Sequence, residues 1–208
     1  MQLATHLIRR VSSDRPEVLR SIDMIDRQIA QIARFAEDLM DATRVNQGAL
    51  RVNMVPVDIA AVLAAPLSAA ALAAAQRSQA FNIQIADKAL RVEGDPVRLA
   101  QAVSNLLNNA VKYTPECGCI TVNVFADHKD LVVSVKDDGL GISDALLPHI
   151  FDLFAQSSRT IAASAGGLGV GLAVVKAVAE AHGGTVSAIS AGPGAGSEFT
   201  LRLPIVIE

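Results

Sequence analysis

The chain has 208 residues and a mass of 21.7 kDa, enough for one full domain with a smaller attachment. Half of it is hydrophobic, but no run reaches the roughly 18 uninterrupted apolar residues of a membrane span, and we interpret the nearest candidate, DIAAVLAAPLSAAALAAAQ, as a soluble helix because it is rich in alanine and contains a proline. The net charge of −3, with Lys and Arg dispersed, gives no basic patch for nucleic acid. These properties favour a cytoplasmic chain that contacts neither nucleic acid nor membrane.

The first fifty residues have the pattern of a helical hairpin. Residues 1–11 have helical character, and Ser12–Glu17 predicts a turn and a helix start with Pro16 in the first turn. Apolar residues then recur three and four positions apart, which is the heptad repeat of a helix that packs against other helices. The repeat comprises Ile22, Ile25, Ile29, Ile32, Ala36 and Leu39. We expect this helix to end near Gly48, and the very short first arm to continue a helix that lies upstream.

The rest of the chain predicts helices interspersed with strands. The expected helices are Asp58–Gln79, an amphipathic helix that Asp95 caps and that runs to Thr114, a short helix at Asp144–Phe151, and a last helix that ends at His182 before Gly183 and Gly184. The expected strands are Phe81–Ile85, Leu90–Val92, Ile120–Phe125, Leu131–Lys136, Thr185–Ala191 and Ser197–Leu203. Because the strands mostly neighbour one another through hairpins, the predicted fold class is α+β, a two-layer sandwich.

The segment VKDDGLGIS, Val135–Ser143, combines two carboxylates with two glycines. It matches neither a P-loop nor the dinucleotide-binding GxGxxG pattern, and the spacing of its carboxylates is not that of a calcium loop. An ionised carboxylate only accepts hydrogen bonds. Asp137 therefore suits an amino group, such as the exocyclic amine of adenine, better than a phosphate. The simpler alternative is that Asp137 and Asp138 are turn residues after a strand.

Two further segments complete a candidate nucleotide site. Asn105, Asn109 and Lys112 share one face of the amphipathic helix, where two amide oxygens and a cation suit a magnesium ion and the phosphates it bridges. GGLGVGL, Gly166–Leu172, opens the last helix, so backbone amides and a helix N-terminus face an anion. The simpler alternatives are a hydrogen-bonded Asn pair, a surface lysine, and glycines that let a helix pack closely on a sheet.

Five segments occur together in a known family order. The chain resembles the catalytic, ATP-binding region of bacterial sensor histidine kinases, which belong to the ATPase superfamily of gyrase, Hsp90 and MutL. The segments are NLLNNAVKYT (Asn105–Thr114, the N box), DDGLGI (Asp137–Ile142, the G1 box), FDLF (Phe151–Phe154, the F box), GLGVGL (Gly167–Leu172, the G2 box) and GSEFT (Gly196–Thr200, the final glycine motif). The resemblance implies a Bergerat-type fold, with a mixed sheet of about five strands and three main helices, over residues 51–208.

The resemblance also implies residue roles. It assigns Asp137 to the adenine amine, Asn109 to magnesium and Lys112 to phosphate, with Asn105 supporting the metal or phosphate shell. It further implies ATP or ADP as the nucleotide, a mobile lid at Ala155–Leu168, and nucleotide contacts at Tyr113, Gly139, Gly141, Ile142, Arg159, Gly167, Leu168, Gly169, Val170, Gly171, Leu172 and Thr200. Glycines 139 and 141 would let the nucleotide approach the backbone.

Residues 1–50 resemble the second helix of a dimerisation and phosphoacceptor hairpin, which ends in DLMDATRVNQGAL, Asp38–Leu50. This implies a homodimer and a response-regulator receiver domain as partner. His6 is followed by LIRRVSS and does not match the phosphoacceptor motif, so we expect the acceptor histidine upstream of Met1. The chain should then bind ATP without phosphorylating itself, and the sequence leaves open whether its parent is anchored in a membrane.

One position distinguishes the possible reactions. Hydrolytic members of the superfamily carry a Glu four residues before the metal Asn, where this chain has Asn105, and an amide cannot accept a proton from water at neutral pH. Transfer to a histidine is therefore favoured over the alternative of a hydrolytic ATPase with nucleotide-gated dimerisation. A non-catalytic scaffold would need a degraded motif, and none is degraded.

The remaining histidines and cysteines have structural interpretations. His128 falls in a hairpin turn, His149 on a short helix, and His182 at a helix C-terminus, where a positive charge suits the helix dipole. Cys117 and Cys119 are too close for an ordinary disulfide and too few for zinc, which fits a reducing compartment.

Overall fold

The computed structural model describes residues 15–46, 50–86, 90–156 and 168–205. They divide into two compact units, 1–41 and 42–208, each of which is described by itself. Helix α2 (Pro16–Asn46) supplies the described part of the first unit. Its heptad residues Ile25, Ile32 and Leu39 are exposed, each to about half or more. The expected helical segment at 1–11 and the expected helix end at Gly48 lie outside the described residues.

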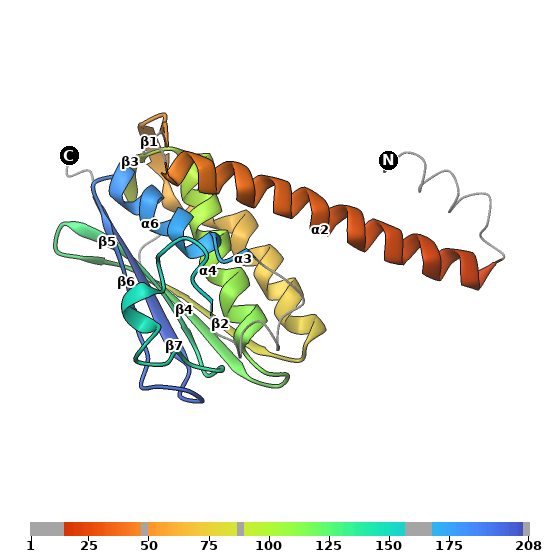
Figure 1. Cartoon of the computed structure of the whole chain (residues 1–208). Coiled ribbons are helices and arrows are strands. Elements are labelled where there is room, and N and C mark those ends of the chain that lie inside the picture. Colours follow the sequence, from red (N-terminus) through yellow and green to blue (C-terminus); the bar gives the residue numbers. More distant parts are fainter. Residues whose placement is uncertain (1–14, 47–49, 87–89, 157–167, 206–208) are drawn as a thin grey trace. The chain divides into compact units, whose positions relative to one another are not determined.

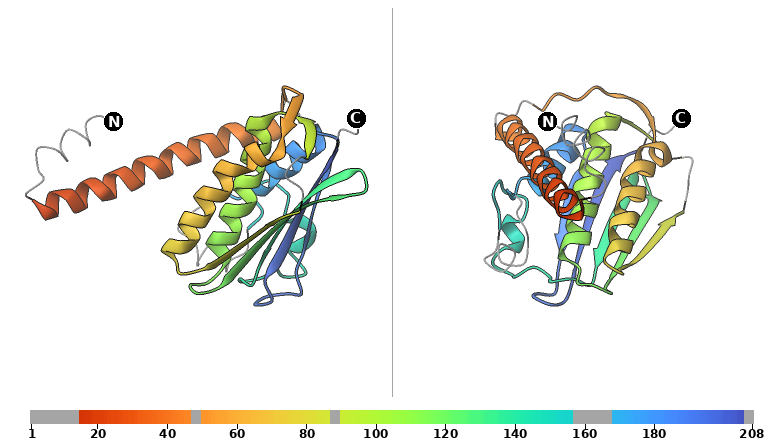
Figure 2. Two further views of the ribbon diagram at one scale, coloured as in Figure 1. Left: turned by 180° about the vertical axis from the view of Figure 1, so that it is seen from behind. Right: turned by 90° about the vertical axis from the view of Figure 1, so that its right-hand side faces the viewer.

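The second unit is built on a mixed five-stranded sheet. The strands are β2 (Ala80–Ile85), β4 (Cys119–Asp127), β5 (Asp130–Asp137), β7 (Ser197–Pro204) and β6 (Thr185–Ile189), in the order β2-β4-β5-β7-β6. All neighbours are antiparallel except β2 and β4, which are parallel because the connection between them crosses over the sheet. Helices α3 (Ile59–Gln76), α4 (Pro96–Tyr113) and α6 (Gly171–Ala181) cover one face, as Figures 1 and 2 show. The predicted α+β two-layer fold is confirmed.

Several expected elements differ in the structure. Helix α3 ends at Gln76, three residues before the expected end at Gln79. The segment expected as a strand at Leu90–Val92 is β3 (Arg91–Gly94), and it pairs with an unexpected strand, β1 (Val55–Asp58), in a separate two-stranded ribbon. The expected helix at Asp144–Phe151 contains only the short 3₁₀ turn η1 (Leu147–His149), because Pro148 lacks the amide that would continue a helix. Strand β6 ends at Ile189 rather than Ala191.

The two longer helices of this unit start at aspartate caps and bury apolar faces. Asp58 accepts a hydrogen bond from the amide of Ala60, and Asp95 accepts from the amides of Val97 and Arg98. Helix α3 is long and apolar enough by composition to cross a membrane, but its buried residues belong to the core cluster that also contains α4 and the sheet. The main contributors from the two helices are Leu63, Leu67, Ala70, Ala74, Leu99, Val103, Leu106, Leu107 and Ala110.

His182 is a buried bridge between two helices. Its Nδ1 lies 2.7 Å from the carbonyl oxygen of Val178, and its Nε2 accepts a hydrogen bond of 2.9 Å from the amide of Asp95. Because a carbonyl only accepts and an amide only donates, the proton is on Nδ1 and the imidazole is neutral. The expectation that a positive His182 suits the helix dipole is therefore wrong; the ring joins the end of α6 to the start of α4.

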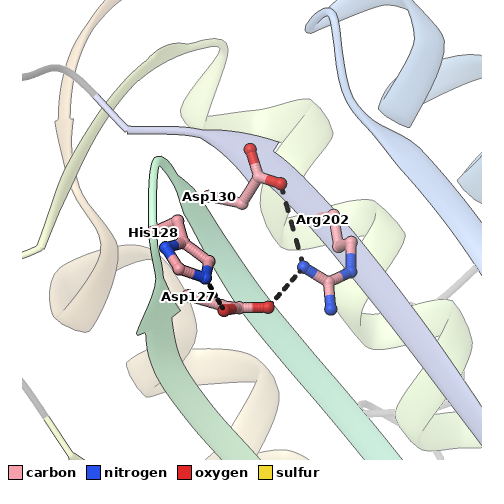
Figure 3. Close-up of polar contacts among 4 residues, drawn as sticks. All are labelled: Asp127, His128, Asp130 and Arg202. Atoms are coloured by element: carbon pink, nitrogen blue, oxygen red, sulfur yellow. Dashed lines mark hydrogen bonds and ion pairs between the residues drawn. The ribbon is translucent and has the colours of Figure 1, made fainter.

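The tip of the β4–β5 hairpin is fastened to β7 by charge pairs. Figure 3 shows Arg202 of β7 between Asp127 and Asp130, at 2.9 Å and 3.8 Å from their carboxylate oxygens. His128 lies in the turn between them with a positive φ of 56° and a side chain that is 94% exposed. The pairs of Arg202 with Asp127 and Asp130 therefore hold the hairpin against β7, and His128 is a residue of the hairpin turn, as predicted.

Candidate functional site

Asp137 is the buried carboxylate of the candidate site. It is the last residue of β5 and is 6% exposed. The amide of Gly139 donates to its Oδ1 at 2.8 Å, and the hydroxyl of Ser197 donates to its Oδ2 at 2.6 Å. A carboxylate has about four acceptor positions, so these bonds leave room for a further donor such as an amine. The two hydrogen bonds fix the orientation of the carboxylate before any ligand arrives.

Burial raises the pKa of Asp137 above its ordinary value. The hydrogen bonds from Ser197 and Gly139 oppose this rise because they favour the ionised form, whereas the neighbouring charge of Asp138 adds to it. Among the described residues no cation pairs with Asp137, and a buried carboxylate in such surroundings gains from a ligand that donates hydrogen bonds. These electrostatics suit an amino group and disfavour a phosphate.

Asp138 has a separate role. Asp138 is exposed, as the sequence predicted. Its Oδ1 accepts a hydrogen bond of 2.8 Å from the amide of Cys119. Its own amide donates to the carbonyl of Cys119 at 3.2 Å. Asp138 therefore fastens the end of β5 to the start of β4 and leaves the candidate site to Asp137.

The two glycines of this loop have internal reasons to lack a side chain. A Cβ on Gly139 would collide with the carbonyl oxygen of Tyr113, which accepts a hydrogen bond of 3.1 Å from the amide of Leu140. A Cβ on Gly141 would collide with the carbonyl of Gly192, and Gly141 has a positive φ of 65°. The loop therefore lies directly on the end of α4. The amide of Ile142, another predicted contact, donates to the hydroxyl of Ser190, and its side chain is buried.

The predicted polar face of α4 is present. Asn105, Asn109, Lys112 and Tyr113 are all partly exposed on this helix. The ammonium of Lys112 lies 5.0 Å from the centre of the Tyr113 ring, close enough for a cation–π interaction. The amide nitrogen of Asn105 donates to the carbonyl of Gly171 at 3.1 Å. Asn105 thus contacts the first residue of α6, while Lys112 and Tyr113 lie at the end of α4 that carries the Asp137 loop.

The glycine motif is described from Leu168 onward. Gly169 has a positive φ of 72°, Val170 is buried, and α6 begins at Gly171. The amide of Phe154 donates to the carbonyl of Gly169 at 3.0 Å, so the F box and the glycine motif are joined. Leu172 belongs to the first turn of α6 and packs against the core. Arg159 and Gly167, with most of the predicted lid, lie outside the described residues.

The structure does not bring Thr200 into the site. Residues 197, 199, 201 and 203 of β7 share one face of the sheet, whereas Thr200 pairs with Ser134 and Ser187 on the other. The residue beside Asp137 is Ser197, which the sequence analysis missed. Counting back in steps of two from the apolar Phe199, Leu201 and Leu203 gives Ser197 and excludes Thr200.

The donor set fits a nucleotide-held magnesium ion. Among the described residues, no group of three or more His, Cys, Asp or Glu side chains is placed to hold a metal. Magnesium in nucleotide sites usually has one or two protein oxygen ligands and completes its shell with phosphates and water. The amide oxygen of Asn109, on the same face as Lys112, meets this smaller requirement.

Comparisons with known proteins identify the family of the chain. Residues 94–207 match the family described as histidine kinase-, DNA gyrase B-, and HSP90-like ATPases. The chain is 30% identical to the sensor protein GacS of Pseudomonas syringae over 207 residues, 96% of this chain and 23% of that protein. It is 31% identical to the sensor-like histidine kinase SenX3 of Mycobacterium tuberculosis over 209 residues, 100% of this chain and 50% of that protein.

Solved structures give the same result. The mycobacterial sensor histidine kinase MprB has a TM-score of 0.63 and 28% identity over 75% of this chain and 100% of that chain. The chain spans between about a fifth and a half of the length of the curated relatives it matches. It belongs to the family of histidine kinase-, DNA gyrase B- and HSP90-like ATPases, in the branch of the sensor histidine kinases.

Proposed function

We propose that residues 51–208 form the ATP-binding catalytic domain of a protein-histidine kinase, which transfers the γ-phosphoryl group of ATP to a histidine. The observation that carries the proposal is the Asp137 carboxylate, buried, oriented by Ser197 and Gly139, and next to the end of α4. This arrangement provides acceptors for an amine at one end of a helix whose side chains suit phosphates.

The proposed roles divide the nucleotide between three elements. Asp137 accepts from the adenine amine, and Ser197 holds that carboxylate in place. Asn109 and Lys112 of α4 hold a magnesium ion and the phosphates, and Tyr113 lies beside the nucleotide. The amides at Gly169–Gly171, where α6 begins, face the phosphates. When bound, magnesium neutralises phosphate charge and bridges phosphate oxygens.

Asn105 supports transfer rather than hydrolysis. Its amide nitrogen is committed to the carbonyl of Gly171, so the side chain stabilises the start of α6. An amide at this position cannot remove a proton from water. This hydrogen bond uses only the nitrogen of the side chain, so we propose a positioning role for Asn105 in addition to its place in the metal or phosphate shell.

The acceptor histidine is proposed to lie outside these 208 residues, because none of the four histidines stands in a phosphoacceptor motif. Residues 1–50 are proposed to belong to the dimerisation hairpin of a homodimer. The exposed apolar side chains of α2 support this, among them Met24, Ile25, Ile32, Leu39 and Met40. We further propose that a response-regulator receiver domain takes the phosphoryl group from the histidine, in the cytoplasm.

Calorimetric titration with ADP and ATP in the presence of Mg²⁺ tests the proposal. We expect binding by the unaltered chain and at least a tenfold weaker affinity for Asp137→Ala, because the hydrogen bond from the adenine amine to a charged acceptor is worth about 1.5 kcal/mol or more. We also expect γ-phosphoryl transfer to an added hairpin that carries the phosphoacceptor motif, with little steady-state release of phosphate. Rapid ATP hydrolysis without transfer would favour the hydrolytic alternative, and absence of nucleotide binding would refute the site.

A further inference from the structure

Two side chains of the turn between α3 and β2, Arg77 and Gln79, donate hydrogen bonds to the last turn of α4. The guanidinium of Arg77 donates to the carbonyl of Thr114 at 3.1 Å and to that of Lys112 at 3.4 Å. The side-chain amide of Gln79 donates to the carbonyls of Val111, at 3.0 Å, and Thr114, at 2.8 Å. Two side chains from outside the helix therefore satisfy three of its terminal carbonyls.

These contacts are unusual for a surface turn. The last carbonyls of a helix have no partner within it, and most are satisfied by water or by the chain that follows. Here Gln79 is 6% exposed and Arg77 is half-buried, so both give up hydration to make the bonds. The positive guanidinium of Arg77 also interacts favourably with the negative end of the helix dipole. The cost of burying both groups is offset only while the carbonyls stay within reach.

The opposite side of the same turn carries the nucleotide site. The carbonyl of Tyr113, which neither Arg77 nor Gln79 contacts, accepts from the amide of Leu140. Leu140 follows directly on the Asp137–Gly139 loop, and Gly139 has no room for a Cβ against the same carbonyl. Lys112 and Tyr113, two residues of the proposed site, belong to this same turn. A shift of the turn would therefore move Lys112, Tyr113 and the Asp137 loop together.

We propose that Arg77 and Gln79 are positioning residues for nucleotide binding. They fix the last turn of α4 from behind, and thereby set the spacing between the Asp137 carboxylate and the Lys112 ammonium. Neither side chain touches the nucleotide. The inference rests on the proposed function, because it assigns to two residues outside the five segments a role in positioning the proposed nucleotide site.

Three variants test the support. Arg77→Met keeps the length of the side chain and removes its donors. Gln79→Glu keeps its shape and turns a carboxylate oxygen toward the carbonyls of Val111 and Thr114, which repel it. Arg77→Lys keeps the charge but not the two-pronged donor. We expect Arg77→Met and Gln79→Glu to weaken Mg²⁺-ADP binding roughly tenfold, because each removes hydrogen bonds that hold the last turn of α4 in its binding position. Arg77→Lys should recover only part of the loss.

Arg202→Met is the matched control. Arg202 is likewise half-buried and donates to Asp127, but it is five residues along β7 from Ser197, roughly 17 Å away. It should lower the melting temperature as Arg77→Met does while leaving ADP affinity unchanged. Hydrogen exchange gives a second measurement: the Leu140 amide should exchange faster in Arg77→Met and Gln79→Glu, and at the native rate in Arg202→Met.

Each result decides the matter. Native ADP affinity in Arg77→Met and Gln79→Glu, or a loss no larger than that of Arg202→Met, would overturn the inference and leave the proposed function intact. Full recovery by Arg77→Lys would assign the effect to charge and would also overturn it. If the unaltered chain binds no nucleotide, the proposed function fails and the inference fails with it.

Discussion

The side-chain amide of Asn105 donates to the carbonyl of Gly171 across 3.1 Å, and so joins two motifs that lie 66 residues apart in the sequence. Asn105→Ala should cost about 1 kcal/mol of unfolding free energy and weaken ATP binding severalfold, because the start of α6 loses its partner. Asn105→Asp should lower stability further, since its oxygens cannot donate to a carbonyl at neutral pH. Urea denaturation and calorimetry measure both effects. Native affinity in both variants would contradict the positioning role of Asn105.

Asp137→Asn should weaken nucleotide binding and raise the stability of the fold at pH 7. Burial raises the pKa of Asp137 in the folded chain, so the unfolded carboxyl ionises first as the pH rises above its ordinary pKa of 3.8. The folded state therefore loses stability across the interval from that value to the raised pKa. The asparagine variant avoids this loss, and it should melt at a higher temperature than the parent at pH 7, with the difference shrinking toward pH 4. Its ADP affinity should fall at least tenfold. A pH-independent difference would contradict this account.

Ser197 and Thr200 form a matched pair on one strand. Ser197→Ala removes the 2.6 Å hydrogen bond that orients the Asp137 carboxylate, and it should weaken ADP binding by about tenfold, the factor for one hydrogen bond to a charged group. Thr200→Ala alters the opposite face of the sheet and should leave ADP binding unchanged. Titration of both variants side by side measures this. Equal losses would restore Thr200 to the site.

His182→Ala should be among the more destabilising histidine substitutions in the chain. It empties a buried position and leaves the amide of Asp95 without its acceptor, for a combined cost of about 2–4 kcal/mol. His149 offers the control, because its side chain is 67% exposed and its pairing with Asp152 is a surface contact. His149→Ala should change stability by less than about 0.5 kcal/mol. Chemical denaturation that ranks the two in the reverse order would refute the bridge.

The sequence predicted the α+β class and most elements because these follow from local periodicity and capping. The polar face of α4 could be read directly, since helical spacing alone brings Asn105, Asn109 and Lys112 to one side. The five ordered segments then indicated a family, which the comparisons confirmed, and a nucleotide site, which stays a prediction.

The errors concern pairings that local sequence does not encode. The partner of His182 is 87 residues earlier in the chain, so its neutral form could not be inferred from a position at a helix end. β1 was missed because its proline argues against a strand, and only β3, far along the chain, completes it. Thr200 was a different error: the alternation along β7 held the answer, and the motif was read without it.

Gly139→Ala tests the contact between the Asp137 loop and α4. The new Cβ would meet the backbone of Tyr113, which cannot yield as a flexible side chain can. We expect a loss of about 1–3 kcal/mol, the usual range for overpacking, together with weaker ADP binding. Gly192→Ala is the control: its Cβ would meet nothing within 4 Å, so only its positive φ of 114° would be strained. Thermal melts of the two variants separate collision from backbone strain.

The same contact bears on how degenerate relatives should be interpreted. Because the glycine at position 139 is demanded by the chain's own Tyr113 carbonyl, selection for folding alone would retain it after a descendant had lost every use for ATP. In a relative that has lost kinase activity, an intact glycine at this position would therefore be evidence of the inherited fold and not of ATP binding. Loss of activity would first appear as substitutions at Asp137, Asn109 and Lys112, because the fold could accept other side chains there.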